Sequence, residues 1–344
     1  MRQARKWTAG LAFLLAFAFA CPAAALDAET EVGQEQLKAK LEAEKQPDGW
    51  YFRFKPSANA SYNNSQSVVG QPTGSTFTFG TALDLLITLR KGDHEWRNTL
   101  YITEAISRTP VIDEFIISAD DLKFESMYLY YFKEWVGVYG RLALDTSIFP
   151  GYDVQPAPTL YAIKRQNGGI DYTLDDKIKL TDPFQPLTLK EGVGPFFRPL
   201  AREAVNLEIM LGLGAWQTFA NGQLTVDDDG DTPLREIKEL ENVYQLGAEN
   251  LYKLWGDLWE KRIGYLVAAE FMMPFVVIPD NPDVSGIDKL NINLNGRIDF
   301  RFTAWASLTY ELKAIKESQI LNAWQVQNNL LLTFSYALDE YVAL

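Results

Sequence analysis

Cysteine and histidine each occur once in this sequence of 344 residues. Cys21 falls within the predicted export signal described below, so the chain that remains after cleavage has no thiol. Disulfide scaffolds and cysteine-based metal sites are therefore excluded. The sequence also lacks a nucleotide-binding glycine pattern, zinc-ligand spacing and an internal repeat.

An unbroken apolar run stands near the N-terminus, at residues 11–20. It follows the basic residues Arg2, Arg5 and Lys6 and precedes the small residues 23–25. This order predicts a secretory signal over residues 1–25, cleaved before Leu26. A transmembrane anchor is the alternative, but the run is too short to span ~30 Å of hydrocarbon as a helix.

A lipoprotein signal is a second alternative for this N-terminus. It requires an aliphatic residue three positions before the cysteine, within a small-residue motif. Here Ala18, Phe19 and Ala20 precede Cys21 and Pro22 follows it, which is a poor match. The sequence therefore favours an ordinary cleaved signal.

The chain left after cleavage combines negative charge with many aromatic residues. Removal of the signal takes away three positive charges, which moves the formal net charge from −13 to about −16 and makes nucleic acid an unexpected partner. No further run of about 20 apolar residues predicts a membrane-spanning helix. Yet the sequence holds 9 Trp, 16 Tyr and 20 Phe. An exported chain of this kind is typical of transmembrane β-barrels, whose strands distribute their apolar residues by alternation.

Residues 26–48 differ from the rest of the chain. Leu37 and Leu41 stand among charged residues, which suggests a short solvated helix. We interpret this segment as a periplasmic N-terminal extension to a barrel formed by residues 49–344. The charged residues of the segment are Glu35, Lys38, Lys40, Glu42, Glu44 and Lys45.

From Trp50 onward, apolar and polar residues alternate with the period of two that is typical of a β-strand. In residues 290–302 the even positions are apolar apart from Gly296, whereas the odd positions are Asn, Arg or Asp. The pattern predicts an all-β fold, a transmembrane antiparallel up-and-down β-barrel of about 12 strands. The predicted strands are 50–63, 74–90, 94–108, 119–132, 135–148, 170–182, 203–217, 240–255, 259–274, 288–302, 305–317 and 324–340.

Strand and loop lengths agree with a membrane barrel. Most predicted strands exceed the ~9–11 residues needed to cross a bilayer, which disfavours a soluble sandwich. Long and short connections alternate, as expected for long outer loops and short periplasmic turns. Residues 182–202 are the exception, because they form a long connection on the periplasmic side. Either they plug the barrel or the predicted strand 170–182 is wrong.

Tryptophan residues gather at the predicted periplasmic strand ends, together with Phe196 and Phe197. Such clustering predicts an aromatic girdle at the membrane interface. Trp216 and Trp324 are expected at the opposite rim. The girdle residues are Trp50, Trp96, Trp135, Trp255, Trp259 and Trp305.

Three stretches resemble an uncharacterised family of predicted outer-membrane barrels known only as a domain of unknown function. They are residues 91–98, residues 120–152 and residues 182–194. The resemblance implies a barrel and transfers no activity. The chain ends in Leu344 rather than in an aromatic residue, so the assembly signal is expected at Tyr336 or Tyr341, or the terminus follows a variant pattern.

The inward faces of the predicted strands collect charges of both signs. Arg262, Arg297 and Arg301 are the best candidates for an anion-attracting patch, because alternate residues of one strand lie ~6.5–7 Å apart on the same face. A structural network of paired charges is an equally good interpretation. The lumen candidates are Arg141, Asp145, Glu208, Glu249, Arg262, Glu270, Arg297, Asp299 and Arg301.

Catalysis and metal binding receive little support. Hydrolysis normally needs a histidine as general base, and the single His94 lies in a predicted periplasmic turn, far from a site at the outer rim. We therefore expect no enzyme. Asp227, Asp229 and Asp231 have the alternate-carboxylate spacing of calcium loops, but the glycine and glutamate of such loops are misplaced. Calcium is the only cofactor that the sequence suggests.

The sequence thus predicts a porin-like barrel of the cell outer membrane. The preferred hypothesis is a narrow channel for passive passage of small polar or anionic solutes. The alternative is a plugged barrel that serves a structural role or contacts partners through its outer loops. In either case the expected partners are outer-membrane lipid, lipopolysaccharide and the barrel assembly machinery. The oligomeric state stays open.

Overall fold

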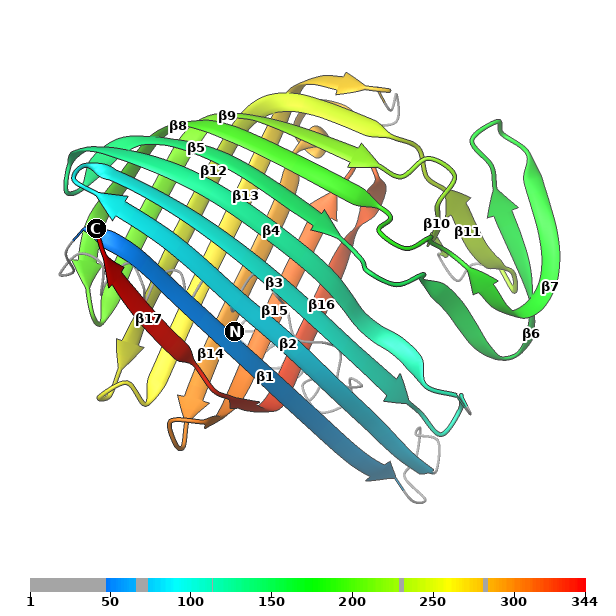
Figure 1. Cartoon of the computed structure of the whole chain (residues 1–344). Coiled ribbons are helices and arrows are strands. Elements are labelled where there is room, and N and C mark those ends of the chain that lie inside the picture. The colour runs from blue at the N-terminus through cyan, green and yellow to red at the C-terminus, as the bar shows by residue number, and fades with distance from the viewer. Residues whose placement is uncertain (1–47, 66–73, 113, 229–231, 281–283) are drawn as a thin grey trace, which may run out of the picture.

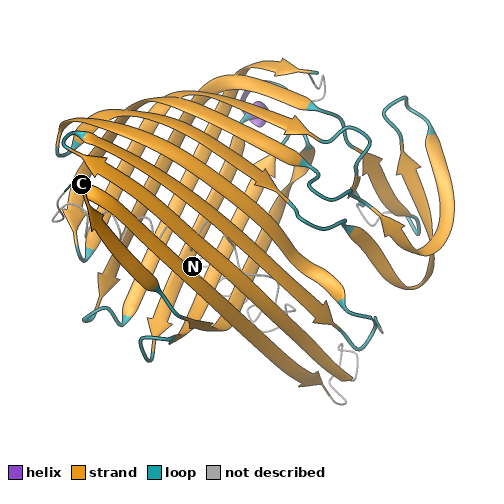
Figure 2. Cartoon of the chain, viewed as in Figure 1, coloured by secondary structure: helices purple, strands orange, loops and turns teal. Residues whose placement is uncertain are grey.

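The computed structural model describes residues 48–65, 74–112, 114–228, 232–280 and 284–344. The predicted signal peptide 1–25 and nearly all of the predicted extension 26–48 lie outside these residues. Within them, no helix has the length and apolar character needed to cross a membrane. Antiparallel strands account for most of the structure, as Figure 2 shows.

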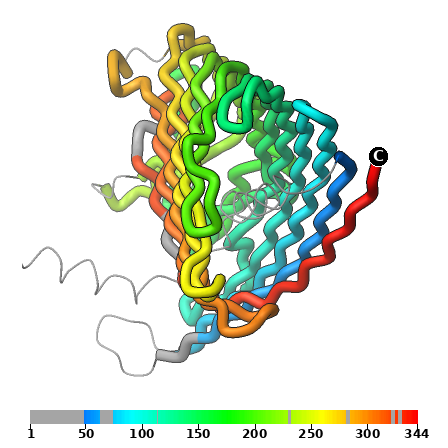
Figure 3. The backbone as a smooth tube through the Cα atoms, turned by 90° about the vertical axis from the view of Figure 1, so that its left-hand side faces the viewer, coloured from blue at the N-terminus to red at the C-terminus, as the bar shows by residue number. Residues whose placement is uncertain are grey.

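Thirteen strands form one closed antiparallel sheet (Figure 1). The last two, β16 and β17, pair with successive parts of β1, at Ser57–Asn59 and at Gly49–Phe54, so they share one position and the barrel has twelve. Figure 3 shows the red C-terminal strand beside the blue N-terminal one at this seam. In chain order the strands are β1 (Gly49–Ser65), β2 (Gly74–Lys91), β3 (His94–Arg108), β4 (Ile116–Lys133), β5 (Val136–Thr146), β8 (Leu187–Arg202), β9 (Val205–Phe219), β12 (Val243–Leu258), β13 (Ile263–Ile278), β14 (Asn291–Arg301), β15 (Ala306–Glu317), β16 (Leu321–Ser335) and β17 (Leu338–Ala343).

The alternating sequence explains why these strands close into a barrel. In β2 the even positions from Thr78 to Thr88 are buried and the odd positions from Phe77 to Leu89 are exposed or half-buried. In β14 the buried positions are odd, again the polar set. These strands therefore turn most of their apolar residues outward and most of their polar residues toward the lumen. The predicted fold class, a closed antiparallel barrel of twelve strands, is confirmed.

The two ends of the barrel differ. Connections of two to four residues close one end, at 92–93, 134–135, 203–204, 259–262 and 302–305. We call this the turn end. The opposite loop end has the long connections, above all 147–186 and 220–242.

The two longest connections form a second, four-stranded sheet beyond the loop end (Figure 1). It contains β6 (Tyr152–Lys164), β7 (Ile170–Lys179), β10 (Leu224–Val226) and β11 (Arg235–Glu239). β6 and β11 pair in parallel, and Tyr161, Ile163 and Ile237 pack between them as a small separate core. Before β14, a single turn of 3-10 helix spans η2 (Gly286–Lys289).

The sequence-based prediction of the sixth barrel strand is wrong. Residues 170–179 form β7 of the second sheet, and β8 takes the predicted position between β5 and β9. β8 escaped notice because Gly192, Gly194 and two prolines interrupt its alternation, and because its register with β9 shifts between Phe197 and Leu200. With β8 in the wall, residues 182–202 are neither a long connection at the turn end nor a plug.

Candidate functional site

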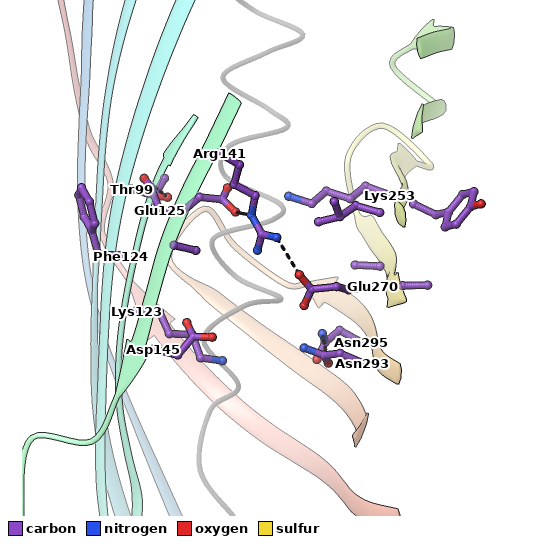
Figure 4. A pocket seen from close by; sticks show the side chains of 15 residues that line it. Thr99, Lys123, Phe124, Glu125, Arg141, Asp145, Lys253, Glu270, Asn293 and Asn295 are labelled. Carbon is purple, nitrogen blue, oxygen red and sulfur yellow. Dashed lines mark hydrogen bonds and ion pairs between the residues drawn. The ribbon is translucent and has the colours of Figure 1, made fainter. Parts of the chain in front are cut away.

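The lumen gathers most of the charges that the sequence placed on inward faces. Arg141 on β5 is the centre of a group that we call the lumen network, together with Glu125, Glu249, Glu270, Lys190 and Asp145. Its guanidinium lies 2.7 Å from the Glu125 carboxylate and 2.7 Å from the Glu270 carboxylate. Glu249 follows at 3.4 Å. Figure 4 shows Arg141 and Glu270 pointing toward each other from separate parts of the wall.

Lys190 on β8 extends the lumen network toward the loop end. Its ammonium lies 3.0 Å from Glu270 and 3.5 Å from Asp145, and 4.4 Å above the ring of Trp216. The Trp216 indole donates a hydrogen bond of 2.9 Å to Glu249. Trp216 is thus a lumen residue, 2% exposed, and the prediction that it lies at the outer rim is wrong.

Glycines in the wall make room for these charges. A Cβ at Gly192 would clash with the Glu249 carboxylate, and one at Gly214 would lie 2.9 Å from the Glu249 Cβ. The two glycines face each other in the β8–β9 pairing. A side chain at either position would push Glu249 away from Arg141.

Two further groups fill the same side of the lumen nearer the turn end. One is an apolar cluster of inward residues with exposed fractions of 5% or less. The other links Arg198 to Glu208 at 3.4 Å and, through the Tyr131 hydroxyl, to Glu95. The apolar cluster consists of Met127, Leu129, Tyr139, Phe196, Met210 and Leu251. Phe196, predicted for the girdle, therefore lies inside the barrel.

The opposite side of the lumen, formed by β1–β3 and β14–β16, is lined mainly by small polar residues toward the loop end. Among the described residues, Asn59 Nδ2 and the hydroxyls of Thr78, Thr103 and Thr333 are buried without a hydrogen-bond partner. Two large residues on this side, Tyr101 and Leu331, pack with Ala82. The small inward residues are Ser57, Asn59, Thr78, Gly80, Ala82, Thr99, Thr103, Ala105, Ser107, Asn291, Asn293 and Asn295.

The arginine ladder predicted on β14 is present, and acidic residues accompany it. Arg297 contacts Asp299 at 2.8 Å and Glu311 at 3.0 Å. Arg301 contacts Asp257 at 2.7 Å. Arg262 lies exposed in the turn between β12 and β13. The three arginines are therefore brought to one end of the lumen, with acidic partners on two of them.

These arginines line an open cavity of about 820 Å³ at the turn end. We call it the mouth cavity. By contrast, the space around Arg141 amounts to about 80 Å³. The sequence analysis missed Arg53 and Lys55, although both follow the inward alternation of β1. The charged residues of the mouth cavity are Arg53, Lys55, Lys261, Arg262, Arg297, Arg301, Asp299 and Asp339.

The predicted girdle tryptophans differ in how exposed their side chains are. Trp96, Trp135, Trp259 and Trp305 have exposed fractions between 41% and 76% at the turn end. Trp50 is half-buried. Trp255 departs from the prediction, because it is 3% exposed and packs against Leu266 inside the barrel. At the other end Trp324 is 51% exposed.

The remaining candidates lie outside the lumen. His94, at the start of β3, is exposed and hydrogen-bonded to the Tyr128 hydroxyl. Of the calcium residues, Asp227 is described, whereas Asp229 and Asp231 are not. Within the described ranges, no three His, Cys, Asp or Glu side chains are grouped so as to hold a metal ion. Calcium binding stays a prediction.

One ion pair stabilises the second sheet. Arg235 lies 3.0 Å from Asp153 on β6 and 2.9 Å from Asp228. Burial acts to raise the pKa of Asp153, but hydrogen bonds from Arg235, Gln155 and Tyr161 outweigh it and hold the pKa below its ordinary value. The pair thus joins β6 and β11 across the sheet.

A closed antiparallel barrel with an apolar outer wall and a polar lumen defines the class of transmembrane β-barrels. No protein-family model matches the sequence, nor does any curated protein, so the resemblance to one uncharacterised family is not supported beyond the barrel itself.

The solved structures to which the chain is similar include an autotransporter translocator domain and an outer-membrane channel. The translocator domain of the autotransporter NalP from Neisseria meningitidis is 8% identical with a TM-score of 0.38, over 89% of this chain and 96% of that one. An outer-membrane channel from Pseudomonas putida F1 is 12% identical with a TM-score of 0.37, over 86% and 96%. OprB from Pseudomonas putida is 11% identical with a TM-score of 0.27, over 88% and 96%. At these values the likeness adds nothing to what the strand pairing shows.

Proposed function

We propose that this chain is an integral outer-membrane barrel through which small polar or anionic solutes pass passively. The turn end would face the periplasm and the second sheet the cell exterior, because short turns and long loops take those sides in outer-membrane barrels. The apolar outer wall supports the membrane location. The predicted signal peptide supports export.

The observation that carries the proposal is the unequal lining of the lumen. Large and charged side chains fill the side formed by β4, β5, β8, β9, β12 and β13. Toward the loop end, the side formed by β1–β3 and β14–β16 carries small polar residues, several with unpaired hydrogen-bonding atoms among the described residues, whereas its charged residues gather toward the turn end. Buried polar atoms of this kind need water or solute as partners. A solute path along that side would therefore offer hydrogen bonds throughout.

A second candidate function is a plugged structural barrel. The lumen network favours it, because Arg141 is paired with three carboxylates and the adjacent apolar cluster is fully buried. Such a barrel would act through its second sheet at the cell surface and conduct nothing.

Single-channel recording in a planar bilayer separates the two functions. The refolded mature protein is expected to give steady steps, and Ala105→Trp, which places a large ring on the small polar side, is expected to reduce them. Ala58→Trp is the matched control, because Ala58 points outward from β1. Silence from wild-type protein shown to be folded would establish the plugged barrel instead. Equal loss in both variants would contradict the proposed path.

A further inference from the structure

The mouth cavity carries more positive than negative side chains. Six basic residues and two carboxylates line its 820 Å³. They come from four separate places in the sequence: β1, the β12–β13 turn, β14 and β17. Closure of the barrel brings β1 next to β16 and β17 and so assembles the group.

Ion pairing neutralises only part of this basic character. Arg53 pairs with Asp339, Arg301 with Asp257, and Arg297 with Asp299 and Glu311. A guanidinium has five N–H donors, and one carboxylate can accept two of them in the bidentate geometry. Lys261 lies 3.5 Å from Glu203, and its side chain is 65% exposed. Six cations thus stand against five carboxylates, and the exposed Lys261 and Arg262 offer their charge to a further anion.

The loop end has the opposite electrostatic character. Residues 220–242, which contribute to the second sheet, contain seven acidic and two basic residues. Over the length of a barrel strand, well beyond the ~8–10 Å screening distance at physiological salt, the two ends act independently. Anions are thus attracted at the turn end and repelled at the loop end.

We propose that the mouth cavity is an anion-binding vestibule for compact oxyanions, the phosphate or carboxylate groups of small solutes. The planar guanidinium group of arginine matches the geometry of both phosphate and carboxylate. The cavity has room for a phosphate with its hydration water or for a small organic dianion. This inference rests on the proposed function for its role in transport, whereas binding itself can be measured without any current.

Calorimetric titration of the detergent-solubilised mature protein with inorganic phosphate tests the vestibule directly. Lys261→Gln/Arg262→Gln removes two exposed cations of the cavity and is expected to weaken phosphate binding about five- to tenfold, from Coulomb interactions of a dianion at several ångströms in high dielectric. Lys91→Gln/Lys133→Gln is the matched control. It removes two exposed cations at the same end but outside the cavity, and is expected to leave binding unchanged.

Three outcomes would overturn the proposal. They are no heat of phosphate binding to the wild type, equal weakening in the control variant, or unchanged binding in the cavity variant. Conductance without phosphate binding would refute the vestibule and leave the proposed function standing. Phosphate binding to a folded, silent barrel would refute passage and leave the vestibule standing.

Discussion

Arg141 on β5 and Glu270 on β13 meet at 2.7 Å although β8, β9 and β12 separate their strands in the wall. Their side chains therefore join distant parts of the barrel through the lumen. Arg141 also contacts Glu125 and Glu249, so one guanidinium pairs with three carboxylates from β4, β12 and β13. Arg141 is therefore the centre of the lumen network.

Replacing Arg141 is expected to destabilise the barrel strongly. Arg141→Gln leaves three carboxylates in the lumen with their main partner lost, a change that costs about 3–5 kcal/mol in buried pairs. Denaturant unfolding in detergent, followed by tryptophan fluorescence, measures the loss. Restoring stability with Glu249→Gln/Glu270→Gln in the same chain would support the electrostatic cause. A loss below about 1 kcal/mol for Arg141→Gln would contradict it.

Tyr101 is expected to limit passage on the small polar side. It is fully buried against Ala82 and Leu331, so Tyr101→Ala should widen the path and raise single-channel conductance. Tyr139→Ala removes a similar volume from the apolar cluster on the opposite side and serves as control. If conductance rises in the control and not in Tyr101→Ala, the path lies on the side of the apolar cluster and the prediction is contradicted.

The assignment of β8 to the wall can be tested with one charge. Val193 points outward from β8 and is 61% exposed, whereas Leu174 on β7 is 67% exposed in the second sheet. An arginine facing lipid at mid-membrane costs about 2–4 kcal/mol. Val193→Arg should therefore reduce the yield of membrane-inserted, protease-resistant barrel, while Leu174→Arg should not. The reverse result would indicate that residues 170–179, and not β8, cross the membrane.

Acid should loosen the second sheet. The pKa of Asp153 is lowered in the folded state, so its pair with Arg235 contributes stability above the ordinary value of 3.8 and loses it as pH falls below that value toward the lowered one. Hydrogen exchange of β6 should be faster in Asp153→Asn than in the wild type at pH 6. The difference should disappear near pH 2. A difference that persists in acid would mean that packing, and not charge, is lost in the variant.

Much of the wall was predictable, because a period of two assigns each residue to a face. Arg297, Asp299 and Arg301 were placed on one inward face of residues 288–302, and the structure has them there. The girdle prediction, which rested on position along the strand and not on alternation, misassigned Trp216 and Trp255. Their position at strand ends indicated a lipid-facing girdle, whereas their parity places them in the lumen.

Alternation could not decide which sheet a strand joins. Ile170, Tyr172 and Leu174 alternate with polar residues as clearly as a barrel strand does, yet β7 pairs only with β6. β8 lies in the wall although glycines and prolines interrupt its alternation, and it pairs with β5 on one side and β9 on the other. Strand pairing involves two segments, so the alternation within one segment does not show which strand it pairs with.

The sequence by itself determined that the chain is rich in strands, which faces are apolar, and which charges point inward, because side chains alternate strictly along an extended backbone. Only the tertiary structure decided that Arg141 meets Glu270, that Arg53 joins Arg301 at one cavity, and that one side of the lumen is filled while the other is lined by small residues. These relations depend on strand number, tilt and stagger, which fix distances across a closed barrel and leave no trace in the period of any single strand.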